Sequence, residues 1–124
     1  MGTRGCILIV EDNPINLKLV RDILLYQNFE ILVAPDGKSA LEKVSENFNK
    51  INLILMDLKL PDVSGLDVIK KIKNNPEHNN IPIIVVSAHA METDINKCIE
   101  AGCADYITKP INVQEFIKKI TGFF

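Results

Sequence analysis

The sequence lacks an excess of positive charge, and this limits the partners that it can bind. Lysine and arginine total 14 and aspartate and glutamate total 16 among 124 residues, so the formal net charge is −2. Proteins that bind nucleic acid neutralise its phosphates with clustered basic side chains. We therefore do not expect nucleic acid to be the main partner.

Cysteine is scarce and forms no metal-binding or redox pattern. Cys6, Cys98 and Cys103 are an odd number, and Cys98 and Cys103 lie too far apart for a CxxC motif. His78 and His89 complete no zinc-ligand spacing. A chain of this length does not need a disulfide framework. We expect three structural thiols in a reducing cytoplasm.

Long apolar segments and glycine-rich phosphate loops are missing as well. The first apolar run, Cys6–Val10, is too short for a signal peptide or a membrane span. Neither GxGxxG nor GxxxxGK occurs, so nucleotide binding has no support. These absences favour a cytoplasmic protein that does not engage a membrane.

The sequence does contain a regular series of short apolar runs. With 47% hydrophobic and 24% charged residues it is typical of a soluble globular chain, and we expect a single domain over residues 1–124. The runs are Cys6–Val10, Phe29–Val33, Leu53–Met56, Ile83–Val86 and the weaker Ala104–Ile107. Most are unbroken, as in strands of a parallel sheet that is buried on both faces.

Between these runs, apolar residues recur every three or four positions and predict five amphipathic helices. The stripes are Ile15, Leu19, Ile23 and Leu24; Ala40, Leu41, Val44 and Phe48; Leu66, Val68, Ile69 and Ile72; Met91, Ile95, Cys98 and Ile99; and Val113, Phe116, Ile117, Ile120 and Phe124. Asn13 before Pro14 and Asn112 before Glu115 predict helix starts, and Gly102 predicts a helix end. The alternation predicts an α/β fold, a doubly wound (βα)5 sandwich around a central five-stranded parallel sheet.

Polar residues follow four of the five predicted strands. Glu11 and Asp12 follow the first, Asp57 the third, Ser87 the fourth and Lys109 the fifth. Ligand sites of such sheets lie beyond the carboxyl ends of the strands. Three converging carboxylates suit Mg²⁺, and a lysine and a hydroxyl beside them complete the groups that phosphoryl transfer requires. Asp57, on the central strand, is the predicted nucleophile.

Each of these residues has a common structural explanation when taken alone. An aspartate or serine after a strand often forms a turn or caps a helix, and a single lysine is usually a surface residue. The site prediction depends on their joint occurrence at four successive loops of one sheet edge.

Four motifs carry a resemblance to a known family. They are ILIVEDN at residues 7–13, LILMDLKLP at 53–61 with Gly65, VVSA at 85–88 and DYITKP at 105–110. In order and spacing they resemble the receiver domain of bacterial two-component response regulators, over nearly the whole chain. That family has the flavodoxin-like fold also seen in CheY. Within it, the chain is most similar to single-domain receivers of the DivK type and to receivers of hybrid kinases.

The resemblance implies a role for each residue that matches a family motif. Glu11 and Asp12 match the acidic pair that holds Mg²⁺, with Asp12 the more direct ligand. Asp57 matches the phosphoacceptor and also a metal ligand. Lys59 matches the position whose backbone carbonyl contacts the metal.

The family pattern also assigns the groups that respond to phosphorylation. Ser87 matches the switch hydroxyl, and Tyr106 matches the aromatic residue that turns inward once the hydroxyl has moved. Lys109 matches the lysine that contacts the phosphoryl group, and its bond to Pro110 is expected to be cis.

The function implied by the resemblance is a signalling switch rather than a metabolic enzyme. A sensor histidine kinase or a histidine phosphotransfer protein would phosphorylate Asp57 with Mg²⁺, and small phosphodonors would do so as well. The change would alter the face formed by the fourth helix, fifth strand and fifth helix, where a downstream protein binds. Hydrolysis of the acyl phosphate would reset the switch.

Two rim residues depart from the best-known members. Lys59 and His89 each lie two positions beyond Asp57 and Ser87. They either control the access of water, and so the lifetime of the phosphoryl group, or are exposed residues without such an effect.

Two other functions use a similar sheet. A phosphatase or mutase with an aspartyl phosphate needs a carboxylate two residues after the nucleophile, where this chain has Lys59, and it needs a cap domain for which there is no room. A flavodoxin-like electron carrier needs a hydroxyl-rich phosphate loop after the first strand, where Glu11 and Asp12 would repel the phosphate of FMN.

Overall fold

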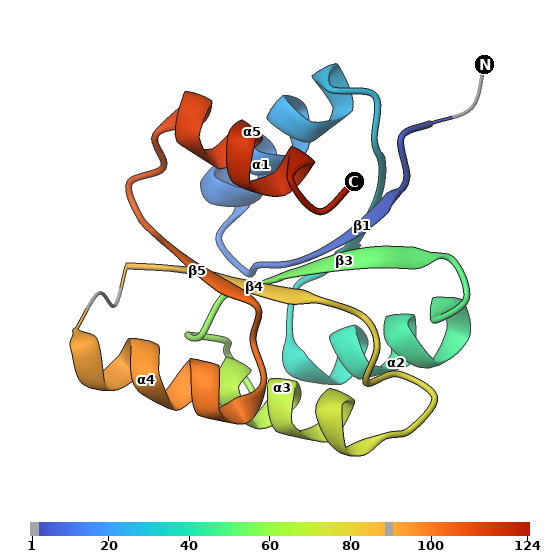
Figure 1. The fold of residues 1–124 in the computed structure, drawn as a ribbon, viewed down its shortest axis with the longest axis vertical. Helices are drawn as coiled ribbons and strands as arrows, with labels where there is room; N and C mark the ends of the chain where they lie inside the picture. The colour runs from blue at the N-terminus through green and yellow to red at the C-terminus, as the bar shows by residue number, and fades with distance from the viewer. Residues whose placement is uncertain (1–2, 89–90) are drawn as a thin grey trace.

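The computed structural model describes residues 3–88 and 91–124, in which strands and helices alternate along the chain (Figure 1). The strands are β1 (Cys6–Val10), β2 (Glu30–Ala34), β3 (Ile51–Met56), β4 (Ile83–Ser87) and β5 (Asp105–Thr108). The helices are α1 (Pro14–Tyr26), α2 (Gly37–Asn47), α3 (Gly65–Asn74), α4 (Glu92–Ala101) and α5 (Val113–Thr121). The predicted first strand has the same bounds as β1, and the other four predicted strands differ from the observed ones by one or two residues at one or both ends.

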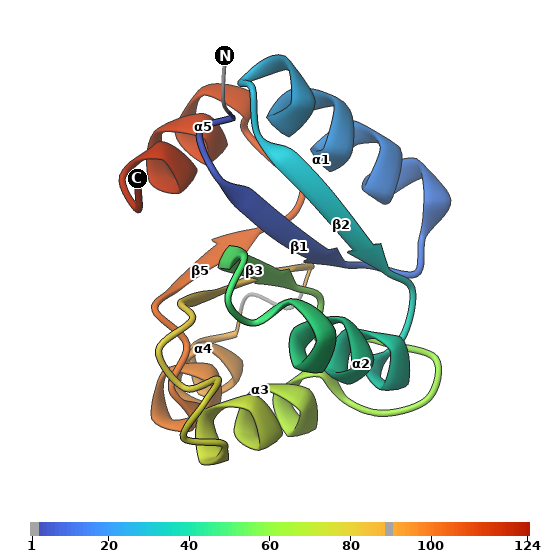
Figure 2. The ribbon, with the colours of Figure 1, turned by 90° about the vertical axis from the view of Figure 1, so that its right-hand side faces the viewer.

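The five strands form one parallel sheet in the order β2-β1-β3-β4-β5. Helices α1 and α5 cover one face, and α2, α3 and α4 cover the other (Figures 1 and 2). The chain leaves β1 toward β2 on one side and returns to β3 on the other, so the carboxyl ends of β1 and β3 flank the switch point of the sheet. The predicted doubly wound α/β fold is confirmed.

The sheet separates two hydrophobic cores. Leu8 and Val10 of β1 point into the core beneath α2, α3 and α4, whereas Ile7 and Ile9 point into the core beneath α1 and α5. All five residues of β1 are buried. This is why the strand is apolar at every position instead of at every second one.

The predicted helix boundaries are confirmed where side chains cap them. Asn13 Oδ1 accepts hydrogen bonds from the amides of Ile15 and Asn16, at 2.9 and 3.2 Å, and Pro14 is the first residue of α1. Asn112 Oδ1 accepts from the amide of Glu115 at 3.0 Å. Gly102 follows α4 with φ of +110°.

The predicted buried face of α1 is wrong at two of its four positions. Ile15 is 79% exposed and Leu19 45% exposed, while Val20 and Leu24 pack against the sheet. Apolar residues occur on more than one side of this helix, so a spacing of three and four fits two faces equally well. The stripes of α4 and α5 are likewise wrong at their ends, where Met91, Ile99, Val113 and Phe124 are exposed.

Within the described residues, no helix is both long enough and apolar enough to cross a membrane.

The three thiols are buried and form no disulfide. We therefore expect them to react slowly. Cys6, Cys98 and Cys103 all belong to the core beneath α2, α3 and α4. Burial raises the pKa of all three, that of Cys103 to about 11, so the reactive thiolate is disfavoured. We expect an aromatic disulfide reagent at pH 8 to label no thiol of the folded protein in the time that labels all three in denaturant. Rapid labelling of the folded protein would contradict this packing.

Candidate functional site

A pocket of about 480 Å³ lies at the carboxyl edge of the sheet. Its lining comes from all four loops that the sequence singled out, and it includes Glu11, Asp12, Asp57, Ser87 and Lys109. Asn13, Pro14, Asn16, Lys59 and Ala88 complete the lining. The predicted convergence of these side chains is therefore present in the structure.

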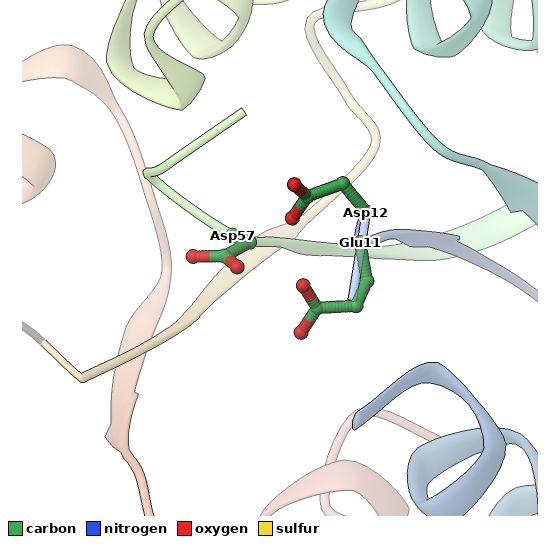
Figure 3. Close-up of side chains that lie close together, drawn as sticks. All are labelled: Glu11, Asp12 and Asp57. Atoms are coloured by element: carbon green, nitrogen blue, oxygen red, sulfur yellow. The ribbon is translucent and has the colours of Figure 1, made fainter. Parts of the chain in front are cut away.

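Three carboxylates gather around a common space in this pocket (Figure 3). One oxygen from each of Glu11, Asp12 and Asp57 lies within 4.8 Å of the others. Glu11 and Asp57 are only 5% and 8% exposed, whereas Asp12 is open to solvent. Hard oxygen ligands this close together match the donor set that Mg²⁺ takes, with water filling its remaining positions.

Lys109 lies between the two buried carboxylates. Its Nζ is 2.6 Å from Glu11 Oε1 and 3.3 Å from Asp57 Oδ2. Burial, helped by hydrogen bonding with Asp57, raises the pKa of Glu11, although Lys109 opposes the change. Burial alone would lower the pKa of Lys109, but the hydrogen bond to Glu11 and the charge of Asp57 outweigh it and raise that pKa. When all are ionised, one ammonium faces three carboxylates, and the surplus negative charge favours a bound cation.

Main-chain contacts hold Asp57 and its loop in place. The Asp57 amide donates to the carbonyl of Val10 at 3.0 Å, and the Lys59 amide donates to Asp57 Oδ1 at 3.2 Å. The Gly65 amide donates to the carbonyl of Leu58 at 2.8 Å. A β-carbon on Gly65 would lie 2.2 Å from the carbonyl oxygen of Asp57, so only glycine allows this approach.

Ser87 and Tyr106 connect the pocket with the neighbouring surface. Ser87 is buried at the end of β4, and Tyr106 on β5 is only 9% exposed. Burial raises the pKa of Tyr106, and a hydrogen bond with the Ser87 side chain opposes that rise. The inward turn of Tyr106 on phosphorylation stays a prediction; in this structure the residue is buried.

Other predictions at the site have mixed outcomes. The Lys109–Pro110 peptide bond is cis, as the family resemblance implies. Lys59 is exposed and lines the pocket, so its effect on phosphoryl lifetime stays a prediction. His89, the second rim residue, lies outside the described residues.

One contact of the acidic pair was missed from the sequence. The Asn13 amide donates to Glu11 Oε2 at 3.3 Å, while the Asn13 side chain caps α1. Asn13 therefore joins the start of α1 to the acidic loop. The Asn13-Pro14 pair indicated the helix start but carried no signal for the bond to Glu11.

Comparison with known proteins assigns the family. The model of the response regulator receiver domain matches residues 7–121, so the chain belongs to this family and is a receiver domain of two-component signalling. The polar-differentiation response regulator DivK of Brucella anthropi is 42% identical over 117 residues, covering 94% of each chain.

Solved receiver structures agree with this fold. A CheY-like receiver domain protein from Methanospirillum hungatei matches with a TM-score of 0.87 and 30% identity, over 95% of this chain and 91% of that one. The receiver domain of the sensor histidine kinase PA1611 from Pseudomonas aeruginosa matches with a TM-score of 0.87 and 28% identity, over 99% and 98%. That structure has a magnesium ion coordinated in its active-site cleft.

The acidic cluster predicts that Mg²⁺ stabilises the folded protein. A ligand that binds only the folded state at ten times its Kd contributes about 1.4 kcal/mol, or roughly 3–6 °C in Tm for a domain of this size. We expect such a shift for the parent and its loss in Asp12→Asn, measured by thermal unfolding with and without Mg²⁺. Asp22→Asn removes an exposed carboxylate of α1 that pairs with Lys18, and should keep the shift. An equal shift in both variants would place the cation elsewhere.

Proposed function

We propose that the chain is a phosphorylation-dependent switch in which Asp57 accepts a phosphoryl group from a phosphohistidine. The donor is a sensor histidine kinase or a histidine phosphotransfer protein. The proposal is carried by the position of Asp57, a buried carboxylate that faces a pocket with Lys109 Nζ 3.3 Å from its Oδ2. Membership of the receiver family supports it.

The transfer exchanges one bond to phosphorus for another. An oxygen of Asp57 attacks the phosphorus, the N–P bond to the donor histidine breaks, and the imidazole leaves with its electron pair. Glu11, Asp12, Asp57 and the backbone carbonyl of Lys59 would hold Mg²⁺, which neutralises charge on the phosphoryl oxygens when bound. Lys109 supplies a fixed positive charge at the same place. Attack by water later releases phosphate and restores Asp57, so the chain acts as a signalling domain rather than a metabolic enzyme.

Ser87 and Tyr106 are the proposed route from the site to the surface. Phosphoryl oxygens on Asp57 would draw in the hydroxyl of Ser87, whose side chain influences the pKa of Tyr106. Tyr106 also lines a groove of about 190 Å³ formed by residues of α4, β5 and α5, among them Ile95 and Phe116. A movement of Ser87 toward the phosphoryl group would alter the surroundings of Tyr106 and so change this groove, which is where we propose that a downstream protein binds.

Substituting the phosphoacceptor tests the proposal. We expect Asp57→Asn to abolish labelling by acetyl phosphate with Mg²⁺, because an amide oxygen is a poor nucleophile and cannot form the acyl phosphate. Labelling is followed by intact-protein mass spectrometry after a brief incubation. Asp22→Asn, which removes an exposed carboxylate of α1 that pairs with Lys18, is expected to be labelled like the parent. Normal labelling of Asp57→Asn would refute the assignment.

The exposed apolar side chains of α1 are the proposed contact for the phosphodonor protein. Ile15 lies between Pro14 and Asn16, two residues that line the pocket, and Leu19 follows one turn later. A partner whose histidine reaches Asp57 must rest beside this rim. Covering Ile15, which is 79% exposed, would contribute up to about 1.5–3 kcal/mol, and Leu19, already more than half buried, would contribute less.

A charged residue on this surface should slow phosphotransfer from a protein donor without slowing labelling by a small-molecule donor. We expect Ile15→Asp to slow phosphotransfer from a histidine phosphotransfer protein at least tenfold, while labelling by acetyl phosphate stays at the parental rate. Leu25→Asp, at another exposed apolar position nearer the other end of α1, serves as the control and should affect neither rate. Equal rates for Ile15→Asp and the parent with the protein donor would show that the donor binds elsewhere.

A further inference from the structure

The loop between β3 and α3 is attached to the start of α2 by one carboxylate. Asp62 Oδ1 accepts a hydrogen bond from the Gly37 amide at 2.8 Å, and Asp62 Oδ2 accepts from the Lys38 amide at 3.0 Å. These are the first two amides of α2, which have no partner inside the helix. The same Oδ1 accepts from the amide of Val63 at 2.9 Å. The two bonded amides hold the pKa of Asp62 below its usual range, so the carboxylate is ionised at neutral pH.

Gly37 gives a second, independent sign of this contact. A β-carbon at Gly37 would lie 2.3 Å from a methyl group of Val63 and 3.3 Å from Asp62 Oδ1. A side chain at position 37 would therefore require the Val63 side chain to move, which shows how closely the loop approaches the helix. In Figure 2 the loop before α3 passes beside the start of α2.

The other end of the same loop holds the phosphoacceptor. An antiparallel bridge pairs Lys59 with Ser64, and the Lys59 amide bonds to Asp57 Oδ1. Asp57 is joined to β1 through the carbonyl of Val10, and the Glu11 amide is joined to β2 through the carbonyl of Ala34 at 3.0 Å. Because α2 follows β2, the bonds from Asp62 close a ring of contacts that runs through β1, β2, β3 and the start of α2.

We propose that Asp62 is a positioning residue for the metal and phosphoryl site. By fixing the tip of the loop to α2, it sets the direction of the Lys59 backbone carbonyl and of the Asp57 carboxylate. The inference rests on the proposed function, in which these two groups help to hold Mg²⁺. It adds a residue that touches neither the cation nor the phosphoryl group.

α2 carries a matched control for this role. Asp36 caps the same helix through the amide and hydroxyl of Ser39, at 2.8 and 2.7 Å, and among the described residues it makes no hydrogen bond to the loop of Asp57. Asp36→Ala and Asp62→Ala both remove capping interactions from the start of α2. The loss of such a cap typically costs about 0.5–2 kcal/mol of stability. Only Asp62→Ala also frees the loop.

The experiment measures Mg²⁺ binding by calorimetry and thermal unfolding without metal for the parent, Asp62→Ala, Asp62→Asn and Asp36→Ala. We expect Asp62→Ala to raise the Mg²⁺ Kd about fivefold, less than the roughly 10–100-fold seen when a direct partner of a metal ligand is lost. Asp62→Asn keeps one acceptor oxygen, so its Mg²⁺ Kd should lie between those of the parent and Asp62→Ala. Asp36→Ala should lower Tm by a similar amount and leave the Kd unchanged. Labelling of Asp62→Ala by acetyl phosphate should recover at saturating Mg²⁺.

Two results would overturn the proposal while leaving the proposed function intact. The first is a Mg²⁺ Kd of Asp62→Ala equal to that of the parent. The second is an equal rise in the Kd of Asp36→Ala, which would show that the loss of helix stability alone causes the change. A parent that neither binds Mg²⁺ nor accepts phosphate would overturn the proposed function and this inference together.

Discussion

Crowding of like charges at the carboxyl edge of the sheet is the constraint on which the site depends. Glu11 and Asp57 are buried within reach of Asp12, and Lys109 bridges the two buried groups. Carboxylates so placed repel one another, and a folded chain keeps them there only because the surrounding structure is firmly packed. The parallel sheet supplies that packing, since β1 and β3 are neighbours, are buried on both faces and end together at the switch point. The same crowding is the physical basis of the proposed cation binding.

Two sets of contacts connect this site with the rest of the molecule. Ser87 lines the pocket and Tyr106 lines the groove of α4, β5 and α5, so these two residues form the proposed route from Asp57 to the proposed binding surface. Asp62 lies on the opposite side, where its carboxylate connects the loop of Asp57 to the start of α2. In the proposed switch, the first set of contacts would transmit a change and the second would resist it. A switch needs both, because a local event biases a two-state element only when the remaining structure stays fixed.

The architecture and the site could be predicted from the sequence because both follow from local rules. Unbroken runs such as Cys6–Val10 indicate doubly covered strands, and the residues that follow parallel strands must meet at one edge. Two features could not be predicted in this way. Ile15 and Leu19 fit the helical period of a core face but lie on the surface, because α1 has apolar residues on several sides. The contact between Asp62 and Gly37 joins residues 25 positions apart, and no spacing rule relates a loop carboxylate to the first amide of another helix.

The central claim is that Asp57 carries the phosphoryl group. The most direct measurement treats the protein with acetyl phosphate and Mg²⁺, reduces the product with borohydride and maps the peptides by mass spectrometry. Borohydride converts an aspartyl phosphate to homoserine and leaves a free aspartate unchanged. We expect homoserine at position 57 and aspartate at positions 12 and 62. Homoserine at another position, or phosphate that withstands reduction on a serine or tyrosine, would contradict it.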